Sequence, residues 1–324
     1  MYSMARKLLL VVFGTLAVAT LALSQQKQKA PVEESDTVIR GGVALVNILA
    51  SVRAKNNALL PNLEKSDIHV FEDGKEQEIR YFARETDLPL TIGMLVDVSG
   101  SMEALIPVER HAGSEFFQQV LRKEDLAFLI SFGKDSELLQ DSTSSPRQLE
   151  RGLNELKPSI RVGFGGGPVP TANSQAGTVL YDAIYLAADE RLRRETGRKV
   201  IILITDGVDT GSRTSRDKAI EAAQKSDAII YSIYYADPRF GGDEGTLKRM
   251  SDETGGRVFR VDRNMNLGSI FKEIQDEMRT QYSITYSPTN SVRDGGYRKL
   301  EYKLTNKDYK IQARKGYYAV ESEQ

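Results

Sequence analysis

The stretch Asp97-Val98-Ser99-Gly100-Ser101 carries three oxygen-bearing side chains at alternate positions. It directly follows the apolar run Leu90 to Val96, which has the composition of a strand buried on both faces. The carboxyl end of such a strand is where open α/β sheets bind their ligands. We expect Gly100 to let the backbone bend so that the three side chains converge. One carboxylate and two hydroxyls then form a hard, oxygen-only donor set.

This donor set favours a hard divalent cation over zinc. Oxygen ligands suit Mg²⁺, or alternatively Mn²⁺ or Ca²⁺, and Mg²⁺ requires octahedral geometry. Neutral hydroxyls would leave much of the positive charge on the cation, so an incoming carboxylate would be a strong further ligand. The start of the following helix favours the same negative group. The pattern predicts a cation site that the Asp or Glu of a protein partner completes.

Two later segments have the character that such a site needs. Gly177-Thr178 precedes a helical pattern, and the apolar strand Val200 to Ile204 runs into Thr205-Asp206-Gly207. Together with the first stretch, these segments resemble the metal-ion-dependent adhesion site (MIDAS) of von Willebrand factor type A domains.

The resemblance implies a role for each of five residues. It implies that Ser99, Ser101 and Thr178 contact the metal directly, and that Asp97 and Asp206 hold it largely through water. The alternative is a domain of the same fold whose site is vacant.

Composition limits the other chemistries. The chain has 324 residues, more than one ordinary domain, with 40% hydrophobic and 27% charged residues. Its net charge of −1 gives no electrostatic footprint for nucleic acid or an anionic membrane. Cysteine is absent, which excludes disulfides, thiolate zinc sites and thiol nucleophiles. His69 and His111 fall in strand and helix patterns as ordinary structural or surface residues, so we predict that the protein is not an enzyme.

The N-terminus has the pattern of an export signal. Residues 1–24 contain a short basic start, an apolar run from Leu8 to Leu23 and the small-x-small sequence Ala22-Leu23-Ser24, as in secretory signal peptides. Residues 25–36 are polar and predict a flexible tether. We therefore expect a periplasmic or extracellular protein. An uncleaved membrane anchor is the alternative.

Three further segments follow the tether. Residues 37–86 predict an N-terminal β segment, including a hairpin of residues 68–72 and 78–82 around Asp73-Gly74. Residues 88–280 alternate strands with helices, as a doubly wound, mostly parallel six-stranded sheet requires. Residues 281–320 predict a C-terminal β segment that pairs with residues 37–86 in a small β-sandwich, so that the type A domain is an insertion. The competing arrangement has two separate β units.

The arrangement of the segments resembles the exported VWFA-related proteins of Acidobacteria. The resemblance rests on the type A domain between short β segments, the Glu72-Asp73-Gly74-Lys75 hairpin and the lead-in from Arg84 to Leu90. It implies a metal-dependent, adhesion-type protein-binding module. The alternative is an envelope scaffold or assembly factor that uses its β-sandwich, with a structural or vacant metal site.

Overall fold

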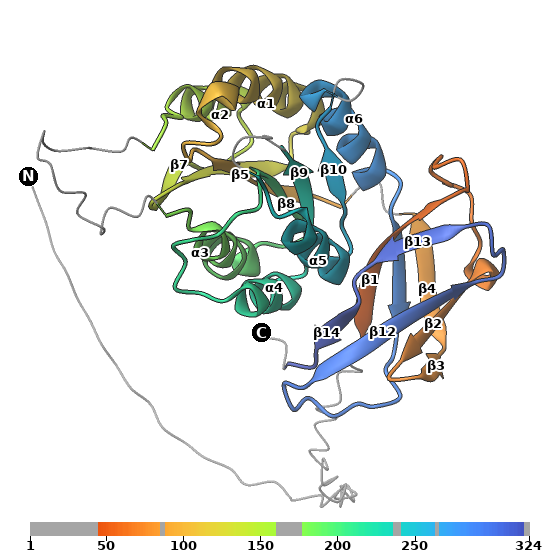
Figure 1. Ribbon diagram of the computed structural model, residues 1–324. Coiled ribbons are helices and arrows are strands. Elements are labelled where there is room, and N and C mark those ends of the chain that lie inside the picture. The colour runs from red at the N-terminus through yellow and green to blue at the C-terminus, as the bar shows by residue number, and fades with distance from the viewer. Residues whose placement is uncertain (1–44, 85–87, 160–176, 236–240, 263–265, 321–324) are drawn as a thin grey trace, which may run out of the picture. The chain divides into compact units, whose positions relative to one another are not determined.

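A six-stranded sheet forms the centre of the α/β domain, in the order β10-β9-β8-β5-β6-β7 (Figure 1). All neighbouring strands are parallel except β7, which runs antiparallel to β6. The strands are β5 (Leu90–Asp97), β6 (Leu126–Phe132), β7 (Ser136–Thr143), β8 (Arg198–Thr205), β9 (Ala228–Tyr234) and β10 (Val258–Arg260). The computed structural model describes residues 45–84, 88–159, 177–235, 241–262 and 266–320, and the predicted signal peptide and tether lie outside these ranges.

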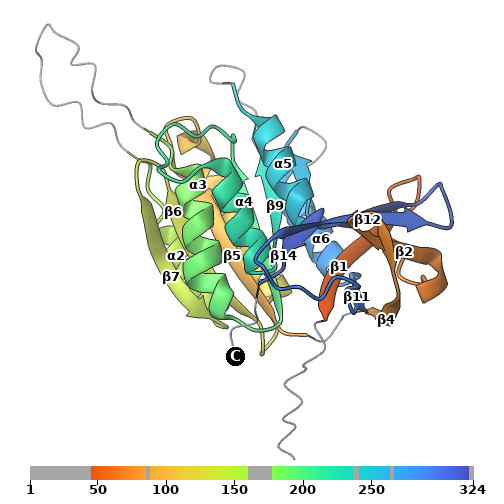
Figure 2. The same cartoon turned by 90° about the horizontal axis from the view of Figure 1, so that it is seen from below.

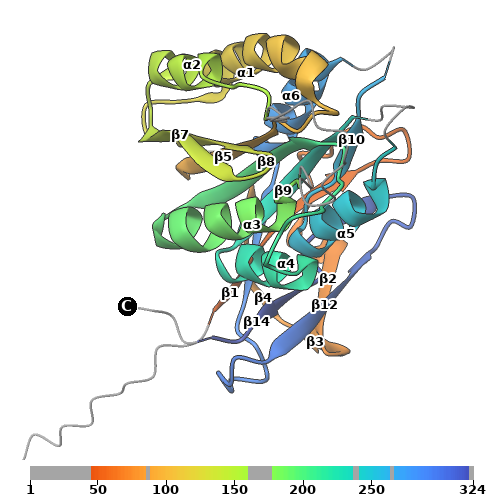
Figure 3. The same ribbon diagram turned by 60° about the vertical axis from the view of Figure 1, so that its left-hand side comes forward.

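Helices cover both faces of this sheet. One face carries α1, α2 and α6, and the other carries α3, α4 and α5 (Figure 3). Every residue of β5 is buried, because this strand lies in the middle of the sheet between the two helical layers. The helices are α1 (Ile106–Val120), α2 (Pro146–Asn154), α3 (Leu180–Tyr185), α4 (Arg216–Lys225), α5 (Glu244–Thr254) and α6 (Leu267–Met278). A π-helical segment, Leu186–Arg191, continues α3.

Short polar side chains begin three of these helices. The side chains of Ser215, Asp243 and Asn266 each accept a hydrogen bond from a backbone N–H in the first turn of α4, α5 and α6. Such bonds satisfy donors that a helix end otherwise leaves without a partner. Helix α5 ends at Gly255, whose φ of 92° is a conformation that glycine adopts without strain.

Strands from both ends of the chain form a β-sandwich. One sheet has the order β13-β1-β11-β4 and the other β14-β12-β2-β3. β1 pairs with β11, and β2 pairs with β12, so each sheet joins early strands to late ones. The strands are β1 (Val46–Arg53), β2 (Ile68–Glu72), β3 (Lys75–Gln77), β4 (Ile79–Arg84), β11 (Tyr282–Tyr286), β12 (Tyr297–Leu304), β13 (Lys310–Ala313) and β14 (Gly316–Tyr318). The predicted fold class is confirmed, while the domain boundaries stay a prediction.

The predicted hairpin around Asp73-Gly74 is partly wrong. Both residues have positive φ, as the turn requires, but β2 pairs with β3 (Lys75–Gln77). The strand expected as its partner, β4, pairs instead with β11 in the opposite sheet. β3 is only three residues long, and the chain changes sheets between Gln77 and the start of β4 at Ile79.

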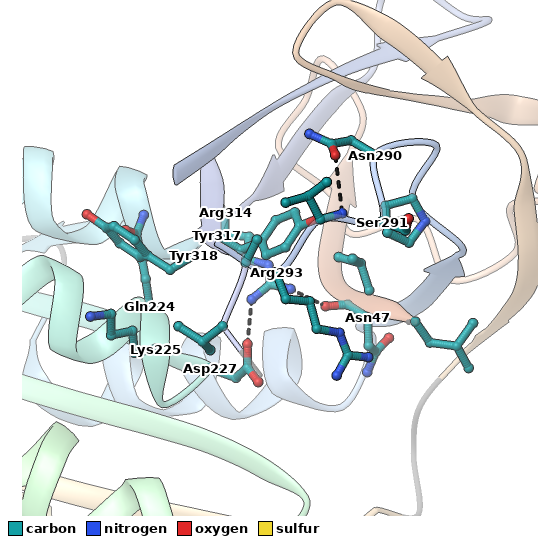
Figure 4. Close-up of a pocket in the computed structure, with 16 residues that line it drawn as sticks. Asn47, Gln224, Lys225, Asp227, Asn290, Ser291, Arg293, Arg314, Tyr317 and Tyr318 are labelled. Atoms are coloured by element: carbon teal, nitrogen blue, oxygen red, sulfur yellow. Dashed lines mark hydrogen bonds and ion pairs between the residues drawn. The ribbon is translucent and has the colours of Figure 1, made fainter. Parts of the chain in front are cut away.

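Within the described ranges, ion pairs join the β-sandwich to the α/β domain at two places. β14 lies beside α4 (Figure 2), and the Arg314 guanidinium pairs with Asp227 at 2.5 Å while donating to the Asn47 carbonyl at 2.6 Å (Figure 4). At the second place, the fully buried Glu277 of α6 binds Arg53 of β1 at 2.5 Å and Arg257 at 2.8 Å. Within the described ranges, no helix is long and apolar enough to cross a membrane.

Replacing Glu277 with alanine should strongly destabilise the protein. The change removes the fully buried carboxylate that Arg53 and Arg257 share and leaves them only the less buried Glu273. Breaking a buried ion pair costs about 3–5 kcal/mol. Urea unfolding of Glu277→Ala should show this as a lower midpoint. Asp276→Ala on the same helix removes only an exposed pair with Lys272 and should leave the midpoint nearly unchanged. Equal midpoints for the two variants would contradict this account.

Candidate metal centre

The predicted site lies at the topological switch point of the sheet. From β5 the chain first adds β6 and β7 on one side, and it later adds β8, β9 and β10 on the other side. The crevice between the carboxyl ends of β5 and β8 is therefore not covered by a crossover connection. Asp97 is the last residue of β5, and Asp206 directly follows β8. The parallel pairing of these strands brings the two carboxylates to the same edge of the sheet.

Four of the five predicted residues are linked by hydrogen bonds. The Ser101 hydroxyl donates to Asp206 Oδ2 at 2.6 Å, across 105 positions of sequence. The Ser99 and Ser101 hydroxyl oxygens lie 3.1 Å apart, and the Ser99 N–H donates to Asp97 Oδ1 at 2.9 Å. The structure thus brings the D-x-S-x-S stretch and the second aspartate together, as the sequence predicts.

Thr178 reaches the same edge through backbone hydrogen bonds on both sides. Its carbonyl accepts from the N–H groups of Thr210 and Gly211, each at 3.1 Å, in the loop that follows Asp206. The next residue, Val179, donates to the carbonyl of Gly133 at 2.9 Å, immediately after β6. The 7% exposed Thr178 therefore lies on a segment fixed between the loops that follow β6 and β8.

Thr205 is a site residue that the sequence analysis missed. Its hydroxyl donates to Asp97 Oδ2 at 2.6 Å and accepts from the Gly207 N–H at 3.0 Å, and the side chain is fully buried. The signal was available, because Thr205 is the last residue of β8 and parallel pairing places it beside the last residue of β5.

The two glycines of the site have different roles. Gly207 has a φ of 82°, and a Cβ there would lie 2.5 Å from the Asp243 carbonyl oxygen, so only glycine fits. Gly100 is not in the left-handed region, and a Cβ there would meet nothing within 4 Å. The expectation that Gly100 is needed to bend the stretch is therefore wrong. The convergence comes from the turn that the Met102 N–H makes to the Ser99 carbonyl at 2.9 Å.

Burial dominates the electrostatics of the site. It raises the pKa of Asp97 from 3.8 to about 6, and the nearby Asp206 acts in the same direction. The hydrogen bonds from Ser99 and Thr205 act in the opposite direction, since they stabilise the ionised form. A buried carboxylate with a second one beside it is costly unless a cation offsets the charge.

The donor set fits a hard divalent cation. It supplies hydroxyl and carboxylate oxygens only, as Mg²⁺, Mn²⁺ and Ca²⁺ prefer. Within the described ranges, no group of three or more Asp, Glu or His side chains could hold a metal ion by itself. The serine and threonine hydroxyls would therefore have to supply ligands beside the two aspartates.

Comparison with known proteins supports the predicted type of domain. Residues 92–208 match the family model for the von Willebrand factor type A domain. A curated relative, inter-alpha-trypsin inhibitor heavy chain H2 of Homo sapiens, is 23% identical over 209 residues, which are 62% of this chain. The chain spans only 21% of the length of that relative.

A solved structure from the mussel byssus shares the fold. Proximal thread matrix protein 1 from the mussel byssus, solved with a zinc-occupied MIDAS motif, has a TM-score of 0.50 at 17% identity. The match covers 64% of this chain and 50% of that one. The conserved hypothetical protein BatB from Bacteroides thetaiotaomicron has a TM-score of 0.46 at 21% identity, covering 58% of this chain and 97% of that one. At 17% identity the likeness to the mussel protein concerns the fold alone.

Replacing Thr205 with valine should destabilise the protein even in EDTA. Valine has nearly the same shape but leaves Asp97 Oδ2 and the Gly207 N–H without the hydroxyl they share, which costs about 1–3 kcal/mol. Thr205→Ser keeps the hydroxyl and is the matched control. Thermal unfolding of both variants measures the difference. A valine variant as stable as the serine variant would show that the hydroxyl does not support Asp97.

Proposed function

We propose that this protein is an exported binding module that captures a carboxylate of a protein partner through a divalent cation. The cation is Mg²⁺, with Mn²⁺ or Ca²⁺ as alternatives. The observation that carries the proposal is the hydrogen bond between Ser101 and Asp206, which joins the ends of β5 and β8 at the switch point. The residues that would hold the cation are Asp97, Ser99, Ser101, Thr178 and Asp206.

The proposed roles follow from the chemistry of the donors. The hydroxyls of Ser99, Ser101 and Thr178 would bind the cation directly, and Asp97 and Asp206 would bind through water. When bound, the cation supplies an open coordination position that accepts a negatively charged oxygen. Because the two carboxylates would act through water, they would offset the charge of the cation only weakly. The open position would therefore attract an Asp or Glu side chain strongly.

The positions of the two histidines support binding rather than catalysis. His69 lies in β2 of the β-sandwich and bonds Glu76 at 2.7 Å. His111 is exposed on α1 and lies 3.4 Å from Glu115. Neither belongs to the loops at the carboxyl ends of β5 and β8, so the proposed module has no histidine base beside its serines.

The proposed export rests on the N-terminal sequence pattern alone. Residues 1–24 have the anatomy of a signal peptide, and they lie outside the described ranges.

A scaffold that binds through its β-sandwich is the second candidate. A cavity of about 230 Å³ lies between the β-sandwich and the end of α4, and Figure 4 shows Arg293 among its lining residues. Three apolar side chains along it are exposed: Leu45, Val292 and Val320. Partner binding there would be insensitive to EDTA, which separates this candidate from the first.

Asp206→Ala should abolish Mg²⁺-dependent binding without unfolding the protein. The side chain lies on a loop outside the core, and its loss removes both a carboxylate and the partner of Ser101. Calorimetry with Mg²⁺ and with Mn²⁺ measures cation affinity. Capture of proteins from envelope extract, with Mg²⁺ against EDTA, measures partner binding.

The control for this experiment is Ser269→Ala, an exposed serine at the start of α6. It should bind the cation and partners like the parent protein. Binding that survives both EDTA and Asp206→Ala would overturn the proposal in favour of the scaffold.

A further inference from the structure

Helix α1 buries a charged residue in the middle of its apolar face. Glu109 is 1% exposed and shares this face with Ile106, Ala112 and Phe116. Neither carboxylate oxygen of Glu109 has a hydrogen-bond partner in the described part of the chain. Buried polar groups are almost always paired, so an unpartnered carboxylate needs a physical reason, such as an ion or an ordered water.

Helix packing places Glu109 near the carboxyl end of β5. Gly113, one turn after Glu109 on α1, lies against this strand, and a Cβ there would be 3.5 Å from the Met94 sulfur. Because α1 follows the loop after β5 and runs back along the sheet, Glu109 lies one turn nearer to the Asp97 end of the strand. Burial raises the pKa of the Glu109 carboxyl, and Asp97 acts in the same direction.

We propose that Glu109 is a third acidic group of the cation centre, which increases cation affinity through Asp97 and ordered water rather than by direct coordination. This inference rests on the proposed function, since it requires a cation at Asp97. It differs from the adhesion-site pattern, because Glu109 lies eight residues after Ser101 and belongs to no part of that pattern.

The charge balance explains why such a group would be useful. The five predicted residues supply only two negative charges, and three of their donors are neutral hydroxyls. A negative charge at Glu109 would attract a cation bound at Asp97 and offset part of the positive charge that the neutral hydroxyls leave on it.

A structural role predicts different behaviour. If Glu109 only filled space between α1 and the sheet, a neutral side chain of the same size would serve better there, with no effect at the cation site. The sequence offers a signal for the residue, because Glu109 interrupts an apolar stripe formed by Ile106, Ala112, Phe116 and Val120.

The test is the variant Glu109→Gln, studied as the full chain. We expect a higher unfolding temperature than the parent in EDTA, because a buried carboxyl is removed, and a 10- to 100-fold weaker affinity for Mn²⁺ and Mg²⁺ by calorimetry, as changes around metal ligands typically cause. Glu109→Met, also neutral and of similar length, repeats the test if the glutamine variant is poorly folded. Glu115→Gln removes an exposed charge from the same helix and should leave cation affinity unchanged.

The outcomes separate this inference from the proposed function. If the parent protein binds no divalent cation, the proposed function fails, and this inference fails with it. If the parent binds and Glu109→Gln binds equally well, only the role of Glu109 is overturned. A similar loss of affinity in Glu115→Gln would also overturn it, because removing any negative charge from α1 would then weaken cation binding.

Discussion

The parallel pairing of β5 with β8 is the constraint on which the site depends. Its register places Val96 beside Ile204, so the next residue of each strand, Asp97 and Thr205, can share a hydrogen bond at the edge of the sheet. The following turns then bring Ser101 to Asp206. Both strands are buried on both faces, so a one-residue shift in register would move every side chain into the opposite helical layer. The packing of the whole core therefore holds the site geometry.

The α/β domain has buried carboxylates near both ends of its sheet, and their charges are compensated differently. At the contact with the β-sandwich, Glu277 is compensated by Arg53 and Arg257. At the opposite edge of the sheet, Asp97 has hydroxyl and backbone donors, and Glu109 has no protein partner in the described ranges. The proposed cation would supply the compensation that the described residues do not give Glu109.

The fold class and the convergence of the D-x-S-x-S stretch with Asp206 could be predicted from the sequence. Apolar runs that end in polar residues indicate where buried strands end. The sequence did not predict that β2 and β4 separate into different sheets, since a three-residue strand such as Lys75–Gln77 gives no pattern of its own. It also missed Thr205 and Glu109. Local periodicity shows that Glu109 interrupts an apolar stripe. It does not show which strands and helices lie side by side, and the roles of both residues depend on that.

The most direct test of the account is a crystal structure of the protein with Mn²⁺, using the anomalous scattering of the ion to locate it. The account predicts one strong peak between the loops after β5 and β8, within coordination distance of the hydroxyl oxygens of Ser99, Ser101 and Thr178. Absence of a peak at that place, or a peak coordinated by other residues, would contradict the claim that these loops form a cation site.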